Sequence, residues 1–154
     1  MFPDNENAVL LSMKDVNHLL ASYSRHEFEL DEAHWPSVEH YFQAMRFDDL
    51  ALREAVRCTD HPDSARKLAH KKRRRARKDW AAVQVTYMTR GTYVKARTHP
   101  EVAQALLATV DRPIVETSQY DYFWGCGRDT RGHNHFGRVL MAVRERLREP
   151  AGPA

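Results

Sequence analysis

The chain has few cysteines and no long apolar run, and each shortage excludes a class of protein. Cys58 and Cys126 are the only cysteines among 154 residues, which excludes a disulfide framework and leaves too few thiolates for a zinc site. The pair fits a reducing compartment. No apolar stretch could span a bilayer, and Asp4 and Glu6 interrupt the N-terminus, so we expect neither a membrane segment nor a signal peptide. These absences predict a cytoplasmic protein.

Nucleotide-binding loops and repeats are also missing. The sequence contains no phosphate-loop lysine motif, no dinucleotide fingerprint after a strand and no internal repeat. A length of 154 residues with 42% hydrophobic and 29% charged residues is typical of one globular domain with a real core. We therefore predict a single domain over 1–149, followed by a frayed tail over 150–154.

Positive charge is concentrated in one place although the net charge is only +3. Residues 71–78 read Lys-Lys-Arg-Arg-Arg-Ala-Arg-Lys and are nearly all basic. This block is either a solvated surface or a surface for phosphate or nucleic acid. No aromatic residue is interleaved with it before Trp80, which argues against a stacking platform for single strands.

The periodicity predicts a mainly helical α+β fold with a few short strands. Helices are expected at 38–47, 50–56, 62–68, 80–94, from 100 through 106, and 136–148. In the 80–94 helix we expect the inward face to carry Trp80, Val83, Tyr87 and Val94, with Met88 at its edge and Gly91 weakening the end. Strands are expected at 8–13, 26–30 and 114–116, with the first two in a small antiparallel sheet, and 117–135 is expected to be loop.

The helix expected at 38–47 carries two stripes. Pro36 and Ser37 are typical of a helix start. One stripe is apolar, and beside it Glu39, Gln43 and Arg46 follow one another at helical spacing. Taken alone, the polar stripe is most simply a solvated rim in which Glu39 neutralises Arg46.

A second unusual stretch, residues 121–137, precedes the last helix. It contains Gly125, Gly127, Gly132 and Gly137, and glycine lets a backbone approach a ligand closely. N–H groups at the start of the following helix favour an anion. The alternative is a structural loop whose aromatic residues fill a gap.

Glu39 and Asp121 are candidate paired carboxyl groups. Cleavage of a glycosidic bond needs one group that protonates the departing atom and another that activates water or stabilises an oxocarbenium-like carbon. Tryptophans such as Trp80 and Trp124 offer flat faces for a heterocycle, although Trp80 is by default a core residue. His133 and His135 lack further ligands for a metal, and nothing near Cys126 marks it as a nucleophile.

Three stretches resemble the YbiA-like, or NADAR, family of N-glycosidases. The first reads Trp35-Pro-Ser-Val-Glu39-His-Tyr-Phe-Gln43 and continues to Arg46-Phe47. The second is Lys78-Asp79-Trp80 with Met88 after it. The third, which is the most specific, comprises Ile114-Val115-Glu116-Thr-Ser118, Asp121, Trp124-Gly125-Cys-Gly127, Gly132-His-Asn134, Gly137, Leu140-Met141 and Arg144. Together they extend over about residues 19–148.

The resemblance implies a hydrolase that cleaves an N-ribosidic bond, with Glu39, Trp80 and Asp121 as its functional residues. Family members cleave ribosylamino-pyrimidine phosphates, early intermediates of riboflavin synthesis, or remove ADP-ribose from guanine in nucleic acid. The implied partner is therefore a small ribosyl phosphate substrate or an ADP-ribosylated nucleic acid. No metal, organic cofactor or membrane is implied, and the oligomeric state is left open.

Further residues are expected around these three. Substrate binding is assigned to Trp35, Gln43, Arg46, Trp124, Gly125, Gly127 and Asn134. The phosphate group of the substrate would be bound by Arg46, part of 73–78 and N–H groups near Asn134. Which of Glu39 and Asp121 is the acid and which the base stays open.

The chain departs from the family pattern at several positions, and these departures would change substrate choice more than chemistry. Leu20-Ala21-Ser22-Tyr23 stands where the family often has Leu-Ser-Asn-Phe, and Ala69-His70 stands for Gly-Arg. Arg46 replaces a common lysine, and Lys95-Ala96 replaces Lys-Phe. The alternative of another class is a non-catalytic module that binds ADP-ribosylated or phosphorylated ligands.

Overall fold

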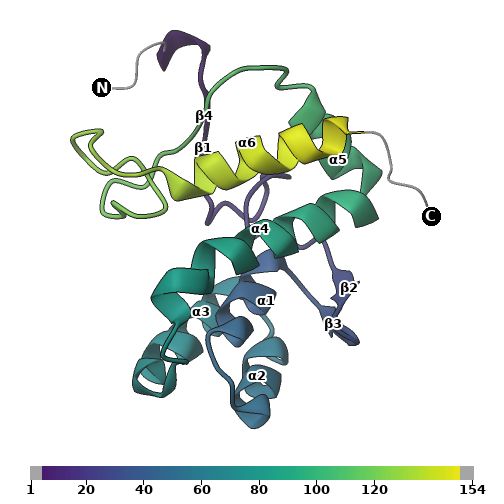
Figure 1. The fold of residues 1–154 in the computed structure, drawn as a ribbon, viewed down its shortest axis with the longest axis vertical. Helices are drawn as coiled ribbons and strands as arrows, with labels where there is room; N and C mark the ends of the chain where they lie inside the picture. Colours follow the sequence, from purple (N-terminus) through teal and green to yellow (C-terminus); the bar gives the residue numbers. More distant parts are fainter. Residues whose placement is uncertain (1–4, 150–154) are drawn as a thin grey trace.

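The helix α4 (Trp80–Thr98) crosses the middle of the molecule and separates two groups of elements in the computed structural model, which describes residues 5–149 (Figure 1). Below it in this view lie α1 (Val38–Met45), α2 (Leu50–Arg57) and α3 (Pro62–Lys71). Above it lie α5 (Pro100–Leu107) and α6 (His135–Arg148). The predicted mainly helical α+β fold is confirmed. The tail predicted over 150–154 lies outside the described residues.

Local sequence signals set the helix starts. The Ser37 hydroxyl accepts the His40 N–H at 3.1 Å and caps α1. Asp49 caps α2 through the N–H groups of Ala51 and Leu52, and Pro62 occupies the first turn of α3, where its missing N–H costs nothing. These caps and the apolar spacing explain why six helices in residues 5–149 begin close to their predicted positions.

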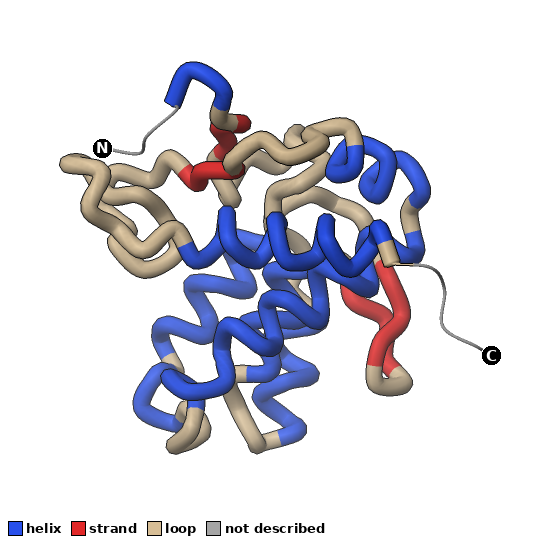
Figure 2. Tube along the Cα trace, turned by 45° about the horizontal axis from the view of Figure 1, so that its top comes forward, coloured by secondary structure: helices blue, strands red, loops and turns tan. Residues whose placement is uncertain are grey.

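The strands form two separate pairs (Figure 2). β1 (Val9–Leu11) pairs in parallel with β4 (Ile114–Glu116), and β2 (Phe28–Leu30) pairs antiparallel with β3 (Ala33–Trp35). The predicted antiparallel sheet of 8–13 with 26–30 is therefore wrong. A parallel partner is separated by much of the chain, so no local turn announces it. The β2–β3 hairpin turns at Asp31 and Glu32, whose positive φ angles occur without the glycine that usually marks such a turn.

The inward face predicted for α4 is also wrong in part. The fully buried residues are Met88, Gly91, Thr92, Lys95 and Ala96, whereas Trp80, Val83, Tyr87 and Val94 are only partly buried. The helix continues past Gly91 because this glycine lies against α1, where a Cβ would stand 2.9 Å from Tyr41 Cδ2. Close packing against α1 and α6 therefore determines which face of α4 is buried.

Every residue of α1 is buried, including its polar ones. Glu39 is 2% exposed and Gln43 is 7% exposed. The solvated rim that a single amphipathic helix predicts is thus absent here, because α1 is covered by neighbouring helices and by the chain before β2. Polar groups buried in this way require partners or a function.

The basic block includes a short 3₁₀ helix, η2 (Arg73–Arg75), between α3 and α4, and another 3₁₀ turn, η1 (Asn5–Asn7), precedes β1. Within residues 5–149, no helix combines the length and the apolar character that crossing a membrane requires.

Candidate active site

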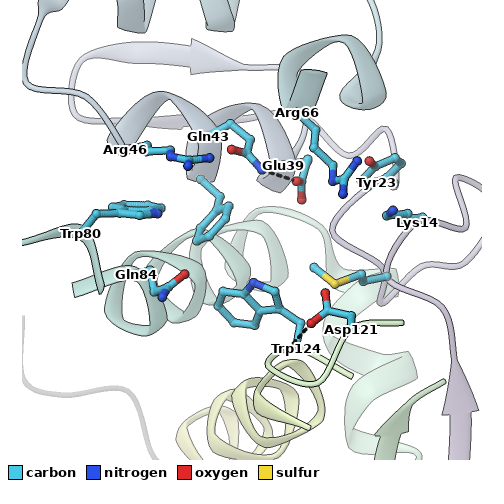
Figure 3. A pocket seen from close by; sticks show the side chains of 12 residues that line it. Lys14, Tyr23, Glu39, Gln43, Arg46, Arg66, Trp80, Gln84, Asp121 and Trp124 are labelled. Atoms are coloured by element: carbon cyan, nitrogen blue, oxygen red, sulfur yellow. Dashed lines mark hydrogen bonds between the residues drawn. The ribbon is translucent and has the colours of Figure 1, made fainter. Parts of the chain in front are cut away.

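A cavity of about 380 Å³ opens beside α1 (Figure 3). Its walls come from parts of the chain that are distant in sequence. They are the segment before β2, the helices α1, α3 and α4, and the loop 117–134. The lining residues are Met13, Lys14, Tyr23, Glu39, Phe42, Gln43, Arg46, Arg66, Trp80, Gln84, Asp121 and Trp124.

Glu39 lies in the wall formed by α1. The Ser22 hydroxyl donates to its Oε2 at 2.9 Å, and Gln43 Nε2 donates to its Oε1 at 2.8 Å. Burial raises the pKa of Glu39, and the bonds from Gln43 and Ser22 oppose that shift. A carboxyl group that is held rigidly and has an elevated pKa is suited to proton transfer.

Asp121 faces the cavity from the loop opposite Glu39 (Figure 3). Its Oδ1 accepts the backbone N–H groups of Phe123 at 3.0 Å and Trp124 at 2.8 Å. This turn fixes the carboxyl group without a cation. Among residues 5–149 no donor is bonded to Oδ2, so that oxygen is available to a ligand.

Aromatic rings line the cavity to one side of the two carboxyl groups (Figure 3). Phe42 stands between two tryptophans, with ring centroids 5.0 Å from Trp80 and 5.3 Å from Trp124. Trp80 also stacks on Tyr87 at an interplanar angle of 23°. Trp80 is partly buried, so one part of its indole packs against the core while another borders the cavity. The surface suits a flat heterocycle.

Two polar atoms at one end of the cavity lack partners. Gln43 Oε1 and Arg46 Nε are buried and form no hydrogen bond with the described residues. Burial, reinforced by the charge of Arg73, lowers the pKa of Arg46. Glu39 does not neutralise Arg46, because its oxygens are bonded to Ser22 and Gln43. Unpartnered buried groups of this kind are costly unless a ligand meets them.

Six of the residues that line the cavity were not predicted as site residues, namely Met13, Lys14, Tyr23, Phe42, Arg66 and Gln84. Lys14, Tyr23 and Arg66 form its other end (Figure 3). Tyr23 donates its hydroxyl to Asp63 Oδ1 at 3.0 Å, and burial raises the pKa of Tyr23. Lys14 and Arg66 lie in segments where neither periodicity nor a motif marks a site, so only the folded chain reveals them.

Ser22 was noted only as a departure from the family pattern. Its hydroxyl bonds Glu39, and its carbonyl accepts the Glu39 N–H at 3.1 Å. This residue is therefore the partner that holds the Glu39 carboxyl group from outside α1. A serine at this position preserves a hydrogen-bonding side chain where the family often has asparagine.

Part of the predicted binding set lies outside the cavity. Trp35 is 3% exposed and donates its indole N–H to Leu30 O at 2.9 Å. Asn134 is buried and bonds the backbone of β4 at Ile114 O and Glu116 N. Gly125 and Gly127 form the loop that carries Asp121 and Trp124, and Gly127 has φ +72°. These four residues support the walls of the cavity, and their contact with substrate stays a prediction.

The N-terminus of α6 is not free to bind an anion. The N–H groups of Asn134, His135 and Phe136 already donate to carbonyl groups of the preceding loop at 3.0 to 3.1 Å. These three amides are engaged with the loop, and phosphate binding near Asn134 stays a prediction. The basic block also lies outside the cavity, since residues 71–75 line a hollow of their own.

The remaining candidates show no catalytic features. Burial raises the pKa of the Cys126 thiol, which is the opposite of nucleophile activation. The rings of His133 and His135 stack on each other at 5.4 Å. No group of three or more His, Cys, Asp or Glu residues within 5–149 is arranged to hold a metal ion.

A pair of carboxyl groups facing one cavity is the arrangement that glycosidases commonly use. The family model of the NADAR domain matches residues 2–148. The chain belongs to the NADAR domain family. It is 36% identical over 131 residues to the N-glycosidase Npun_R5314 of Nostoc punctiforme, covering 83% of this chain and 84% of that protein.

Two further relatives agree with this assignment. The NMR structure of the E. coli protein YbiA has a TM-score of 0.81 and 31% identity, covering 91% of this chain and 84% of that one. The riboflavin biosynthesis protein VVA0006 of Vibrio vulnificus is 37% identical over 147 residues, which cover 95% of this chain but 40% of that protein. The chain therefore corresponds to one part of this longer relative.

Proposed function

We propose that this protein is an N-glycosidase that hydrolyses the N-ribosidic bond of a phosphorylated riboside. The observation that carries the proposal is the pair Glu39 and Asp121 on opposite walls of one cavity, with Trp80 and Trp124 beside them (Figure 3). Similarity to proteins named N-glycosidases supports the type of bond.

In the proposed reaction, the bond between C1′ of the ribose and a nitrogen of the base breaks. Water places a hydroxyl group on C1′, and one of its protons ends on the departing nitrogen. Glu39 transfers the proton, because burial raises its pKa toward the range where uptake and release are both accessible. Asp121 stabilises the positive charge that develops on the ribose, with its Oδ1 held by two N–H groups.

The aromatic residues would hold the base. Trp80 and Gln84 come from the first turns of α4, and Arg46 lies at the same end of the cavity (Figure 3). The unpartnered Gln43 Oε1 and Arg46 Nε can bond polar atoms on a heterocycle or on a phosphate. Similarity to a riboflavin biosynthesis protein favours a ribosylamino-pyrimidine phosphate as substrate.

ADP-ribosyl-guanine in nucleic acid is the second candidate substrate, and the basic block is the observation that favours it. Residues 71–75 line a hollow of about 320 Å³. This block borders the cavity, because Arg77 N donates to Arg46 O at 2.8 Å. Phosphates of a nucleic acid could rest there while the modified base enters the cavity.

Side-by-side turnover assays test the proposal. The wild-type protein is given a ribosylamino-pyrimidine phosphate or DNA carrying ADP-ribosyl-guanine, with the Glu39→Gln protein as the control. Hydrolysis of either substrate by the wild type, with loss of turnover in the variant, supports N-glycosidase action. Binding of both substrates without cleavage would refute it and favour a non-catalytic module.

A further inference from the structure

Lys95 is a buried cation that the proposed reaction does not use. It lies on α4, is 1% exposed and does not line the active-site cavity. Within residues 5–149 its ammonium pairs with no carboxyl group, and its hydrogen bond goes to a backbone carbonyl. The titratable groups near it are His18 and His26, whose pKa values are lowered by burial and also by the Lys95 charge. A buried cation without an anion is costly to the fold, so its presence calls for a function.

The ammonium of Lys95 holds the chain segment before β2. Lys95 Nζ donates to Ala21 O at 2.9 Å, and the same carbonyl accepts the N–H of Ser24 at 3.1 Å. Ala21 is 0% exposed, so solvent does not reach this contact. Burial lowers the pKa of Lys95 to about 7, but an amine keeps N–H donors with or without its extra proton. The lysine therefore ties α4 to a turn outside the helices and strands across the neutral pH range.

The next residue in this turn is Ser22, the partner of Glu39. The Ser22 hydroxyl donates to Glu39 Oε2 at 2.9 Å, and Ser22 O accepts the Glu39 N–H at 3.1 Å. The carbonyl of Ala21 and the Cα of Ser22 belong to one planar peptide unit, which does not twist. Fixing the direction of that carbonyl therefore fixes the plane from which the Ser22 side chain extends toward Glu39.

The other groups around Glu39 do not replace this hold. Burial raises the pKa of Glu39, the hydrogen bonds from Gln43 and Ser22 lower it, and the charges of Arg66 and Lys14 lower it further. Gln43 bonds Oε1 from the same helix as Glu39. Among residues 5–149, Ser22 is the hydrogen-bond donor that reaches the Glu39 carboxyl group from outside α1. The orientation of this carboxyl group relative to the rest of the cavity thus depends on Ser22.

We propose that Lys95 is a positioning residue of the active site, which holds Ala21 O, thereby fixes the Ser22 hydroxyl and through it orients the carboxyl group of Glu39. This inference rests on the proposed function, in which Glu39 transfers the proton. Lys95 itself touches no substrate, because it does not line the cavity. Loss of its ammonium would leave the residues that face the substrate in place and let the Glu39 carboxyl group turn.

A carbon-13 NMR titration of the Glu39 carboxyl group tests this chain of contacts without turnover. The bond from Ser22 lowers the pKa of Glu39, so Ser22→Ala should raise that pKa. Lys95→Met replaces the lysine with a neutral side chain of similar length and should raise it as well. Thr92→Val is the matched control, because Thr92 is also buried on α4 and its hydroxyl has no hydrogen-bond partner among the described residues. It should leave the pKa of Glu39 at the wild-type value.

Turnover supplies the second readout, with whichever of the two candidate substrates the wild type cleaves. Lys95→Met should lower kcat by about 10- to 100-fold, since a displacement of about 1 Å can cost about 100-fold. KM should stay unchanged, because the lining of the cavity is intact. The limb of the kcat/KM profile that reports Glu39 should move to higher pH. Combining Ser22→Ala with Lys95→Met should cost no more than Ser22→Ala alone, because the lysine acts through the serine.

Three results would overturn the proposal. They are an unchanged Glu39 pKa in the Lys95→Met protein, a double variant whose loss in kcat is the product of the two single losses, and a Ser22→Ala protein with the kcat of the wild type. The third keeps the test decisive if Lys95→Met does not fold. A wild type that cleaves neither substrate would reject the proposed function, and the NMR titration would still decide whether Lys95 orients Glu39.

Discussion

Replacing Glu39 with glutamine should make the protein more stable and inactive at the same time. The side chain is 2% exposed, and burial raises the pKa of Glu39 because its charge is poorly solvated. Glutamine has nearly the same shape. Its oxygen can accept from Gln43 Nε2, and its amide can donate to Ser22, whose hydroxyl can still donate to Met13 O at 3.2 Å. All partners stay satisfied and the charge is gone.

The magnitude follows from removal of a buried charge. Desolvation of one buried ion costs several kcal/mol, and hydrogen bonds return part of that cost, so the neutral glutamine should gain on the order of 1 kcal/mol or more in free energy of unfolding. The gain depends on pH. Because the folded pKa of Glu39 is raised above its ordinary 4.5, the native state binds more protons above that pH. Wild-type stability therefore falls as the pH rises above about 4.5, so the advantage of the variant appears only above that pH.

Urea unfolding followed by tryptophan fluorescence measures this difference at pH 4 and pH 7. Turnover should fall by about 10²–10⁴-fold, the usual contribution of a group that transfers a proton. An inactive variant that is also less stable at pH 7 would refute the reasoning, since Glu39 would then be a charge that the fold requires. Full activity would refute the catalytic role.

Glu116→Gln is the matched control. Glu116 is also fully buried, but it accepts Met13 N at 2.7 Å on one oxygen and Ser118 N at 2.6 Å on the other. An amide cannot accept on both sides, so one backbone N–H loses its acceptor. The free energy of unfolding of the variant should be lower by about 1–3 kcal/mol. The two buried carboxyl groups thus respond oppositely, which separates a functional charge from a structural one.

Three further predictions concern the site and its support. Asp121→Asn keeps the oxygen that accepts the N–H groups of Phe123 and Trp124, so it should lower kcat by at least about 100-fold in a turnover assay without changing the unfolding midpoint. Gly91→Ala should lower the free energy of unfolding by about 1 kcal/mol in urea, although alanine has the better helix propensity. The reason is that the added Cβ would stand 2.9 Å from Cδ2 of the buried Tyr41. A higher free energy of unfolding would show that Tyr41 can move. Lys95 is 1% exposed, and burial lowers its pKa from 10.5 to about 7. Between these two pH values the unfolded chain binds more protons than the folded one. The free energy of unfolding of the wild type should therefore rise by about 1 kcal/mol per pH unit over this range. Lys95→Met should abolish this slope in unfolding measured from pH 7 to 10, and an unchanged slope would contradict the assignment.

Much of the architecture could be predicted because its causes are local. Ser37, Asp49 and Pro62 begin helices through groups that act within a few residues. Phe136, Val139 and Leu140 recur at helical spacing along α6, and all three are buried. The resemblance placed Glu39, Trp80 and Asp121 together, and all three line one cavity.

Other features depended on packing between distant segments. The face of α4 was mispredicted because Gly91 and Lys95 are buried by α1 and by the loop at Ala21, whose carbonyl accepts the Lys95 ammonium at 2.9 Å. The parallel pairing of β1 with β4 joins segments more than a hundred residues apart and has no turn to reveal it. Composition cannot encode such pairings, since their free energy comes from long-range contacts.

By itself, the sequence determined the helices, the loop before α6 and the residue types that the chemistry needs. Only the tertiary structure decided that Glu39 is a buried acid bonded to Ser22, that the Asn134 side chain bonds the backbone of β4, and that Lys14 and Arg66 line the same cavity as Glu39. The physical reason is that caps and periodicity act over one or two turns. Burial, pKa and the shape of a cavity arise from neighbours that the chain brings together only when it folds.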